Sequence, residues 1–574
     1  MYLQSFSRLT FRTRFRGLPT ALTPGDDEGW SRTRPLHQSW LRPSSSVARL
    51  VPLVGPSPLS IASSKLIDKT TLESLMVLPE IQTSLDVLDG SSASVGERSI
   101  DEAITNTKRA GEILLGSMPD MYRATLLLEA DLQALCGRYS LANAMLLRHS
   151  RHGGSDIGTD VKTSLQFIQA KMHLNVGEFS YALSEFEDIF EVIERNVERQ
   201  TRQMERSNGD TNEEPVSVIR AAAALTGVGL SKLLMLSNTN DYEVSFSSEC
   251  MEALEAATEI LIEARSGALE SREHVSAAVN LGVAASISLT NLGAAHLIKD
   301  EKDHNLAIDC WTKALETLDT ILPNAMTSAV VSMHKFQIME GIRARAHCNI
   351  AWAMLGIDAG NKARDDLSED RLKEATRHAK VALDVYDELI NGSKRLRGEA
   401  PTDPDDNSGR DSEEWEQVFA DHTSEMSPES ASITLSPHWK LYHRAESARA
   451  LGLLAQCYAA NGMAVTAEGL FQSALDASLT NPFGASVMQR QEGKGEMHQM
   501  SSPSIGLVAR DVRLWYAALC SSWDGKSRKG DALRLRDEAE SIQRWIYPSA
   551  LKEGKINSLD ASLWPFSPQD LDDK

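Results

Sequence analysis

The chain has 574 residues and a formal net charge of -21, from 59 Lys plus Arg against 80 Asp plus Glu. Hydrophobic residues make up 42% of it and charged residues 24%, a composition that excludes disorder throughout. A chain this acidic repels the phosphate backbone, so we expect no nucleic-acid partner. Six widely separated cysteines without a C-x-x-C motif argue against a disulfide framework and against a zinc module.

Residues 1–60 differ from the rest of the chain in charge. The first 50 residues contain eight arginines, three acidic residues and no lysine. Arg8, Arg12 and Arg16 would share one stripe of a helix, and this bias is typical of an organellar presequence. We therefore expect a targeting leader at 1–60, for the mitochondrion, with plastid or cytoplasm as the alternatives. The other interpretations are a disordered leader without a targeting function and a wrongly chosen start codon.

Residues 275–298 form the stretch that comes closest to a membrane span, because they contain no Asp, Glu, Lys or Arg. Seven Ser, Thr, Asn and His side chains dilute the stretch, and polar groups in lipid need partners. We expect a helix packed on more than one side and no stable membrane span.

From about residue 100 onward, apolar residues recur at i, i+3, i+4 and i+7, and no convincing two-residue alternation appears. This periodicity predicts an all-α fold. We expect a linker with a possible short helix at 61–98, helical blocks at 99–398 and 437–547, and a C-terminal tail at 548–574.

One short pattern recurs in these blocks, most clearly at Ala455, Gly462 and Ala467. The small residues allow two helices to approach closely, and the glycine permits a tight turn between them. Larger side chains fill the space between neighbouring pairs, since one pair cannot bury its apolar face alone. The predicted packing residues are Ala130, Gly137, Tyr139, Ala142, Ala170, Gly177, Phe179, Ala182, Phe186, Gly293, Ala307, Trp311, Ala351, Ala375, Ala455, Tyr458, Gly462, Ala467, Phe471 and Ala474.

This pattern resembles the tetratricopeptide repeat over roughly residues 100–547. The resemblance implies an α-solenoid, a superhelix of about seven antiparallel helix pairs. The chain departs from the family in its irregular spacings, in a longer turn at 356–372 and in a polar interruption at 201–215.

Residues 399–432 hold eleven acidic residues and one basic residue, a local net charge of -10. Prolines and serines add helix breaking to this self-repulsion, so we expect an acidic disordered insertion at 399–436. A solvated insertion between repeats is one interpretation, and a docking or phosphorylation segment is the other.

No motif in the sequence predicts catalysis. H-E-x-x-H and G-x-S-x-G are absent, and Gly525-Lys526-Ser527 lacks the first glycine of a phosphate-binding loop, with Cys520 in its place. We therefore expect no catalytic site, no metal site and no cofactor.

The resemblance implies a concave surface that binds a protein or a peptide. We expect a non-enzymatic helical-repeat scaffold that mediates protein–protein interaction in an organelle. A co-chaperone or import-receptor module is one alternative, and a repeat domain that carries or accompanies an unrecognised enzymatic activity is another.

The resemblance also indicates which residues would line this concave groove. In family members that bind a chaperone's terminal carboxylates, lysines and arginines accompany asparagines on the first helices. The equivalent positions here carry no cation, so we expect a neutral or apolar segment as the ligand. Trp352 has a second interpretation, as core between repeats. The candidate groove residues are Thr290, Asn291, Asn349, Trp352 and Gln456.

Overall fold

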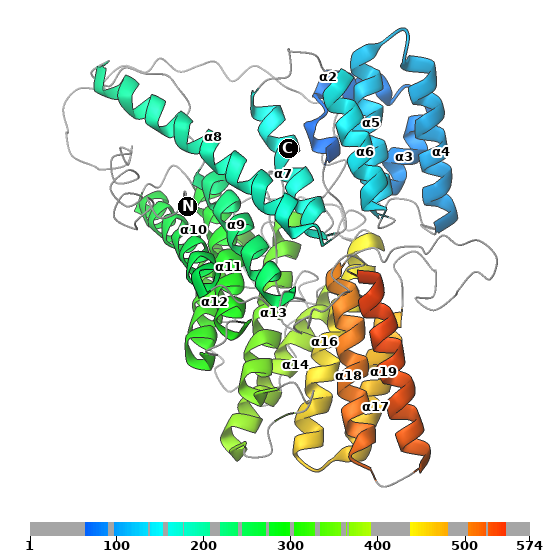
Figure 1. Ribbon diagram of the computed structural model, residues 1–574, viewed down its shortest axis with the longest axis vertical. Helices are drawn as coiled ribbons and strands as arrows, with labels where there is room; N and C mark the ends of the chain where they lie inside the picture. Colours follow the sequence, from blue (N-terminus) through cyan, green and yellow to red (C-terminus); the bar gives the residue numbers. More distant parts are fainter. Residues whose placement is uncertain are drawn as a thin grey trace.

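The protein is all-helical in the part of the chain that the computed structural model describes. There, 17 α-helices and one short 3-10 helix occur, and no β-strand (Figure 1). The described residues are 63–89, 97–135, 138–152, 159–175, 177–206, 218–238, 244–270, 275–298, 303–327, 333–357, 363, 367–391, 437–479, 503–523 and 526–546.

The helices of the first half run from the 3-10 helix to α10. Their bounds are η3 Ser63–Leu66, α2 Lys69–Leu75, α3 Pro79–Asp89, α4 Glu97–Leu114, α5 Pro119–Leu135, α6 Tyr139–His152, α7 Thr159–Asn175, α8 Phe179–Arg206, α9 Val218–Asn238 and α10 Val244–Glu270. The helices of the second half are α11 Val275–Ile298, α12 His304–Thr327, α13 Met333–Leu355, α14 Glu369–Asn391, α16 Pro437–Ala460, α17 Ala464–Leu479, α18 Pro503–Ser521 and α19 Lys526–Ile546.

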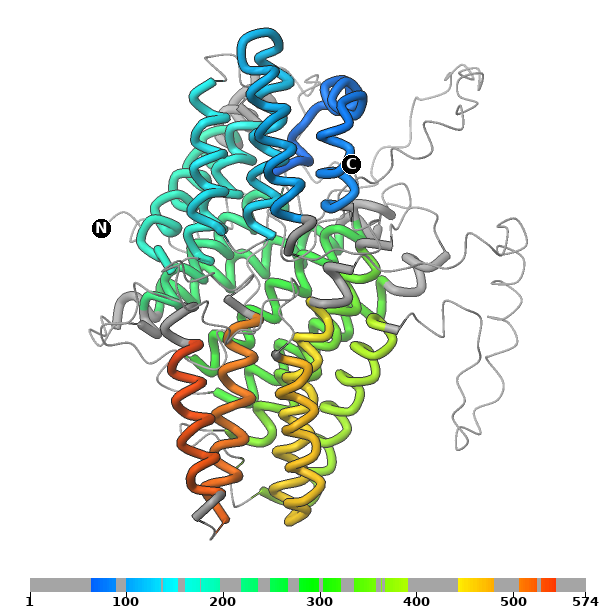
Figure 2. The backbone as a smooth tube through the Cα atoms, turned by 90° about the vertical axis from the view of Figure 1, so that its right-hand side faces the viewer, coloured from blue at the N-terminus to red at the C-terminus, as the bar shows by residue number. Residues whose placement is uncertain are grey.

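Helices that follow one another in the chain pack side by side, as in a helical repeat (Figures 1 and 2). We call the two members of each pair the first and the second helix. Each second helix also packs on the first helix of the next pair, as α8 does on α9 and α12 on α13. The pairs are α3 with α4, α5 with α6, α7 with α8, α9 with α10, α11 with α12, α13 with α14, α16 with α17, and α18 with α19.

Aromatic side chains opposite glycines allow several of these helices to approach closely. Trp311 of α12 is fully buried against Gly293 of α11, where an added Cβ would lie 2.5 Å from the Trp311 Nε1. Trp515 of α18 faces Gly452 of α16 in the same way, with a corresponding distance of 2.9 Å to its ring. A larger residue than glycine would have to separate the two helices at either position.

The predicted packing residues lie mainly in the interior. Tyr458 is half-buried, and Gly137 lies outside the described residues. Gly177 and Gly462 occupy turns, with φ of 81° and 76°, a left-handed conformation that favours glycine. Gly293 is buried. The others are between 0% and 6% exposed: Ala130, Tyr139, Ala142, Ala170, Phe179, Ala182, Phe186, Ala307, Trp311, Ala351, Ala375, Ala455, Ala467, Phe471 and Ala474.

The range expected to be a linker, 61–98, contributes folded helices to the core. Helices α2 and α3 bury Leu75 and Ile81 completely. The buried carboxylate of Asp131 in α5 accepts hydrogen bonds from the backbone N–H groups of Ser63 (2.9 Å) and Ser64 (2.8 Å). The two hydrogen bonds join residues that are 68 and 67 positions apart in the chain, and they fix η3 against α5.

One other expected boundary differs from the observed helices, and a second agrees with them. Helix α8 continues to Arg206, through the first part of the predicted polar interruption. The longer predicted turn after Gly356 is present, since α13 ends at Leu355 and α14 begins at Glu369. The expected leader at 1–60, the acidic insertion at 399–436 and the tail at 548–574 lie outside the described residues.

Helices α9 and α11 are long and apolar enough to cross a membrane by length and composition alone. Within the fold, 78% of the residues 218–235 and 89% of the residues 278–298 are buried. Neighbouring helices therefore cover these two stretches, which is the usual situation of a helix in a protein core.

Candidate functional site

The five residues expected to line an open groove are buried, which corrects that expectation. Their side chains are between 0% and 5% exposed. Thr290, for example, is covered by Trp311 of α12. The Trp311 Nε1 donates a hydrogen bond of 3.0 Å to the backbone oxygen of Thr290. These residues are Thr290, Asn291, Asn349, Trp352 and Gln456.

Two of these residues have polar side-chain atoms that lack a hydrogen-bond partner within the described structure. Asn349 is fully buried, and neither its Oδ1 nor its Nδ2 forms a hydrogen bond. The Nε1 of Trp352 also has none. A buried polar group without a partner costs about 1–3 kcal/mol. Asn349 is therefore a fully buried polar residue whose amide makes no hydrogen bond within the described structure.

A buried ion pair lies one helical turn before Asn349. Arg345 of α13 donates a hydrogen bond of 2.7 Å to the Tyr442 hydroxyl and lies 3.1 Å from the Glu446 carboxylate, both on α16. Burial and the nearby Arg345 lower the pKa of the adjacent His443 to about 3, so this imidazole is neutral at pH 7. Burial likewise raises the pKa of the Cys348 thiol to about 12, which keeps it protonated.

Further charged residues lie on the next two first helices. Arg449 of α16 is 1% exposed, and Arg510 and Asp511 of α18 are each 2% exposed. Arg510 Nε lies 2.9 Å from an Asp511 carboxylate oxygen. These arginines lie outside the positions that are equivalent to the family's groove residues, so they were not expected from the sequence. The signal that could have found them is a charged residue between apolar residues on every side, as in the run 505–513.

The directions of these side chains follow from about 100° of rotation per helical residue. On α18, Trp515 faces α16, Tyr516 stacks on Phe471 of α17 at 5.5 Å, and Arg513 pairs with Glu538 of α19 at 3.1 Å. Asp511, four residues before Trp515, lies near the side that faces α16, and Arg510, three residues before Arg513, lies near the side that faces α19.

The rotation of about 100° per residue also gives the directions of side chains on α16 and α13. On α16, Glu446 faces α13 and Gly452 faces α18, so Arg449 and Gln456 lie between these two directions. On α13, Arg345 and Asn349 are four residues apart and share one face. We call this set the inner stripe: Arg345, Asn349, Arg449, Gln456, Arg510 and Asp511.

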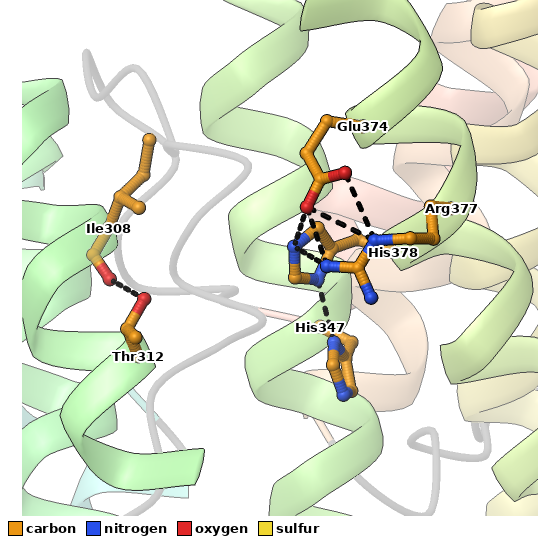
Figure 3. Close-up of polar contacts among 6 residues, drawn as sticks. All are labelled: Ile308, Thr312, His347, Glu374, Arg377 and His378. Atoms are coloured by element: carbon orange, nitrogen blue, oxygen red, sulfur yellow. Dashed lines mark hydrogen bonds and ion pairs between the residues drawn. The ribbon is translucent and has the colours of Figure 1, made fainter. Parts of the chain in front are cut away.

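A pair of histidines joins α13 to α14 (Figure 3). The Nδ1 atoms of His347 and His378 lie 2.7 Å apart, and the Nε2 of His378 lies 3.0 Å from Arg377 Nη2, which donates to it. The same Nε2 also lies 3.3 Å from a Glu374 carboxylate oxygen, and one of the two rings donates to the other between the Nδ1 atoms. Burial lowers the pKa of His347 to about 3 and that of His378 to about 4, helped in both cases by neighbouring positive charge. Glu374, which pairs with Arg377, completes this cluster.

A surface hollow of about 430 Å³ lies between the start of α14 and the end of α16. Lys373 there pairs with Glu369 at 2.7 Å, and Arg377 pairs with Glu374. Acids on the same helix neutralise these two cations, and Lys380 is a third cation in the lining of the hollow.

Among the described residues, no group of three or more His, Cys, Asp and Glu side chains could hold a metal ion. The five described cysteines, Cys250, Cys310, Cys348, Cys457 and Cys520, are buried and unpaired by disulfides. In the described part of the chain, the buried polar residues along the first helices are the best candidate site.

The fold places the protein in the class of all-helical proteins in which each helix packs on its neighbours in the chain, as in helical repeats. No protein-family model matches the sequence, and no curated protein shows significant similarity to it.

A substitution of Trp352 tests directly whether its side chain is buried between helices. Because its side chain is only 5% exposed, we expect Trp352→Ala to destabilise the protein by about 3–5 kcal/mol, the usual cost of removing a buried tryptophan. Trp523→Ala is the matched control, because this half-buried ring lies under Arg528 at the protein surface. Thermal unfolding of both variants measures the difference. An unchanged melting temperature for Trp352→Ala would instead place this ring on an open groove.

Proposed function

We propose that this protein is a non-enzymatic scaffold, an α-solenoid of tetratricopeptide type that binds a segment of another protein along the inner stripe. The pattern of helix contacts supports the solenoid. First helices contact one another from pair to pair (α9 with α11, α11 with α13, α13 with α16, and α16 with α18), whereas second helices of successive pairs are less closely packed. In a curved array, the layer with the closer contacts lies on the inside.

The observation that carries this proposal is the buried Asn349, whose amide forms no hydrogen bond within the described structure. An amide offers both a donor and an acceptor, so it can pair with the N–H and C=O groups of a bound chain. This amide therefore suits an extended segment of polypeptide chain.

Residues 1–60 support an organellar, mitochondrial location for this scaffold, because their arginine-rich composition is typical of a presequence. Proximity labelling of the full chain in cells, followed by mass spectrometry, would identify both the compartment and the candidate partners.

A partner found in this way allows a sharp test with Asn349→Ala. We expect this change to weaken partner binding about 5- to 100-fold, because it removes hydrogen bonds worth about 1–3 kcal/mol. It should change the melting temperature little, since the amide forms no hydrogen bond within the described structure. Isothermal titration calorimetry and thermal unfolding measure the two quantities.

Asn461→Ala is the matched control for this experiment, because Asn461 is an exposed residue in the turn after α16. It should leave both affinity and stability unchanged. Equal partner affinity for the Asn349→Ala variant and the unmodified chain would exclude the inner stripe as the binding surface. A large loss of stability would show that Asn349 serves the fold.

A further inference from the structure

We propose that the hollow between α14 and α16 is a second binding site, which takes an extended peptide segment of another protein. This segment carries a large apolar side chain and, about three to five residues away, a carboxylate. The site is separate from the inner stripe and does not depend on it, because other side chains form it. The proposal follows from the size and the lining of the hollow, from one exposed lysine, and from apolar side chains beside the hollow.

The hollow is large enough for a ligand. Its volume of about 430 Å³ lies within the range of about 300–1,000 Å³ that is usual for ligand pockets. Helices α14 and α16 pack side by side there (Figure 1). Glu369 at the start of α14 and Asn461 just after the end of α16 line the same hollow, so the two helices run in opposite directions. From Glu369 to Lys380, the lining extends over about 16 Å of α14.

The lining between these ends is mainly apolar. Leu372 and Thr376 come from one face of α14, and Cys457 and Tyr458 come from α16. Cys457 is only 2% exposed, whereas Leu372 and Tyr458 are half-buried. These two side chains therefore leave apolar surface in the hollow that a large apolar side chain can cover. Removing this surface from water stabilises a complex.

One cation in the lining is available to a ligand. Lys373 and Arg377 pair with acids on α14, but Lys380 forms no ion pair among the described residues. Asp384, one turn further along α14, is close enough to influence Lys380 electrostatically without forming an ion pair with it. The ammonium group of Lys380 is exposed and has three donors, so a carboxylate can accept a charge-assisted hydrogen bond from it. Charge complementarity therefore favours a ligand with a carboxylate at this position.

The apolar side chains beside the hollow favour a peptide over a small molecule. Met463 and Val465 follow Asn461 by two and four residues, and they are 45% and 83% exposed. A small molecule that fills the hollow cannot also cover this turn, whereas a polypeptide can cover both. Leu372 and Lys380 are eight residues apart on α14, or about 12 Å. An extended chain spans this distance with about three to five residues, which sets the spacing of the two side chains of the ligand.

Peptide display on the full chain tests the chemistry of this ligand. We would select a phage-displayed library of random peptides of about 12 residues, long enough to span the hollow and the turn, and sequence the enriched clones. We expect the enriched peptides to pair a Phe, Trp, Leu or Met with an Asp or Glu about three to five residues away. Enrichment without this pairing, or no enrichment, would overturn the proposal.

A selected peptide labelled with fluorescein then locates the site by fluorescence anisotropy. We expect Lys380→Glu to weaken its binding about tenfold or more, because the carboxylate then meets a like charge. Lys529→Glu is the matched control, because Lys529 is an exposed lysine of α19, and it should change nothing. Replacing the acidic residue of the peptide with its amide, or the apolar residue with Ala, should also weaken binding. Equal affinity for the Lys380→Glu variant and the unmodified chain would exclude the hollow.

The two binding sites fail in different ways. If a selected peptide loses affinity in the Asn349→Ala variant but not in the Lys380→Glu variant, it binds the inner stripe, and the hollow is not its site. If Lys380→Glu abolishes peptide binding while Asn349→Ala leaves partner binding unchanged, the hollow stands and the inner stripe is excluded. A dimer of the full chain in sedimentation velocity that Lys380→Glu dissociates would show that a second copy occupies the hollow, which would overturn the proposal.

Discussion

Trp311→Ala should destabilise the protein by about 3–5 kcal/mol, because this ring is completely buried between α11 and α12. The ring also donates a hydrogen bond of 3.0 Å to the Thr290 carbonyl. Gly293→Ala should cost about 1–3 kcal/mol in the unmodified protein, since the added Cβ would lie 2.5 Å from the Trp311 Nε1. In a Trp311→Ala background the same Gly293→Ala change should cost less than about 0.5 kcal/mol, because the overlap is gone.

Urea unfolding followed by circular dichroism at the helical band measures this coupling between the two sites. Gly469→Ala is the control, because Gly469 is an exposed helical glycine with no atom within 4 Å of an added Cβ. It should be neutral or stabilise the protein by up to about 1 kcal/mol, through the higher helix propensity of alanine. Additive costs at Gly293 and Trp311 would contradict the close packing described for α11 and α12.

Acidification should destabilise the protein through its buried histidines. Burial lowers the pKa of His443 and His347 to about 3, and that of His378 and His149 to about 4, in each case with help from a nearby positive charge. The unfolded chain therefore binds protons that the folded chain cannot bind. This stability is fully present above about pH 6.5 and is lost as the pH falls from there toward 3–4.

A His443→Gln variant isolates one of these contributions. At about 1.4 kcal/mol per pH unit, His443 should account for about 2 kcal/mol of the stability lost between pH 7.5 and pH 5. The loss should therefore be smaller by this amount in the variant than in the unmodified protein. Unfolding in urea at the two pH values measures it, and His152→Gln, at an exposed position, should change nothing. An equal loss in the His443 variant would refute the buried, neutral state of this imidazole.

The His443→Gln variant is needed for comparison because the titration of Glu185 changes the stability of the protein in the opposite direction. Burial raises the pKa of Glu185 to about 7, although His173 beside it lowers the value. This carboxyl group becomes easier to accommodate as the pH falls, since its folded pKa lies above its unfolded one. The total pH dependence therefore combines opposing contributions, whereas the difference between the protein and its His443 variant reports on one group.

The existence of the helices was predictable because it depends on local sequence. Apolar residues at helical spacing predicted the helical character of the chain from residue 100 onward, and the described helices α4 to α14 begin and end within or close to the block expected at 99–398. The helices α2 and α3 were harder to predict, since each is short and Pro79 interrupts the pattern. Their stability comes from packing, with Leu75 and Ile81 in the core, rather than from propensity.

The candidate site was predicted only in part. Asn349, Trp352 and Gln456 were identified on the right helices, but they were expected on an open surface and are buried. The arginines of the inner stripe were missed, because a charged residue in an apolar run gives no indication of its direction. The hydrogen bond between Arg345 and Tyr442 joins residues that are 97 positions apart in the chain. Local sequence patterns cannot predict a contact over this separation.

The sequence by itself determined the helical character, the glycine and aromatic positions of the helix pairs, and the arginine-rich composition of residues 1–60. These features follow from backbone periodicity, side-chain size and charge, which act within a few turns of chain. Only the tertiary structure decided that η3 is fixed to α5 through Asp131, that α11, α13, α16 and α18 are buried on nearly every side, and that charged residues lie along the inner stripe. Those arrangements depend on which distant helices meet, and the free energy of burying a side chain is set by all its neighbours in space rather than by its neighbours in sequence.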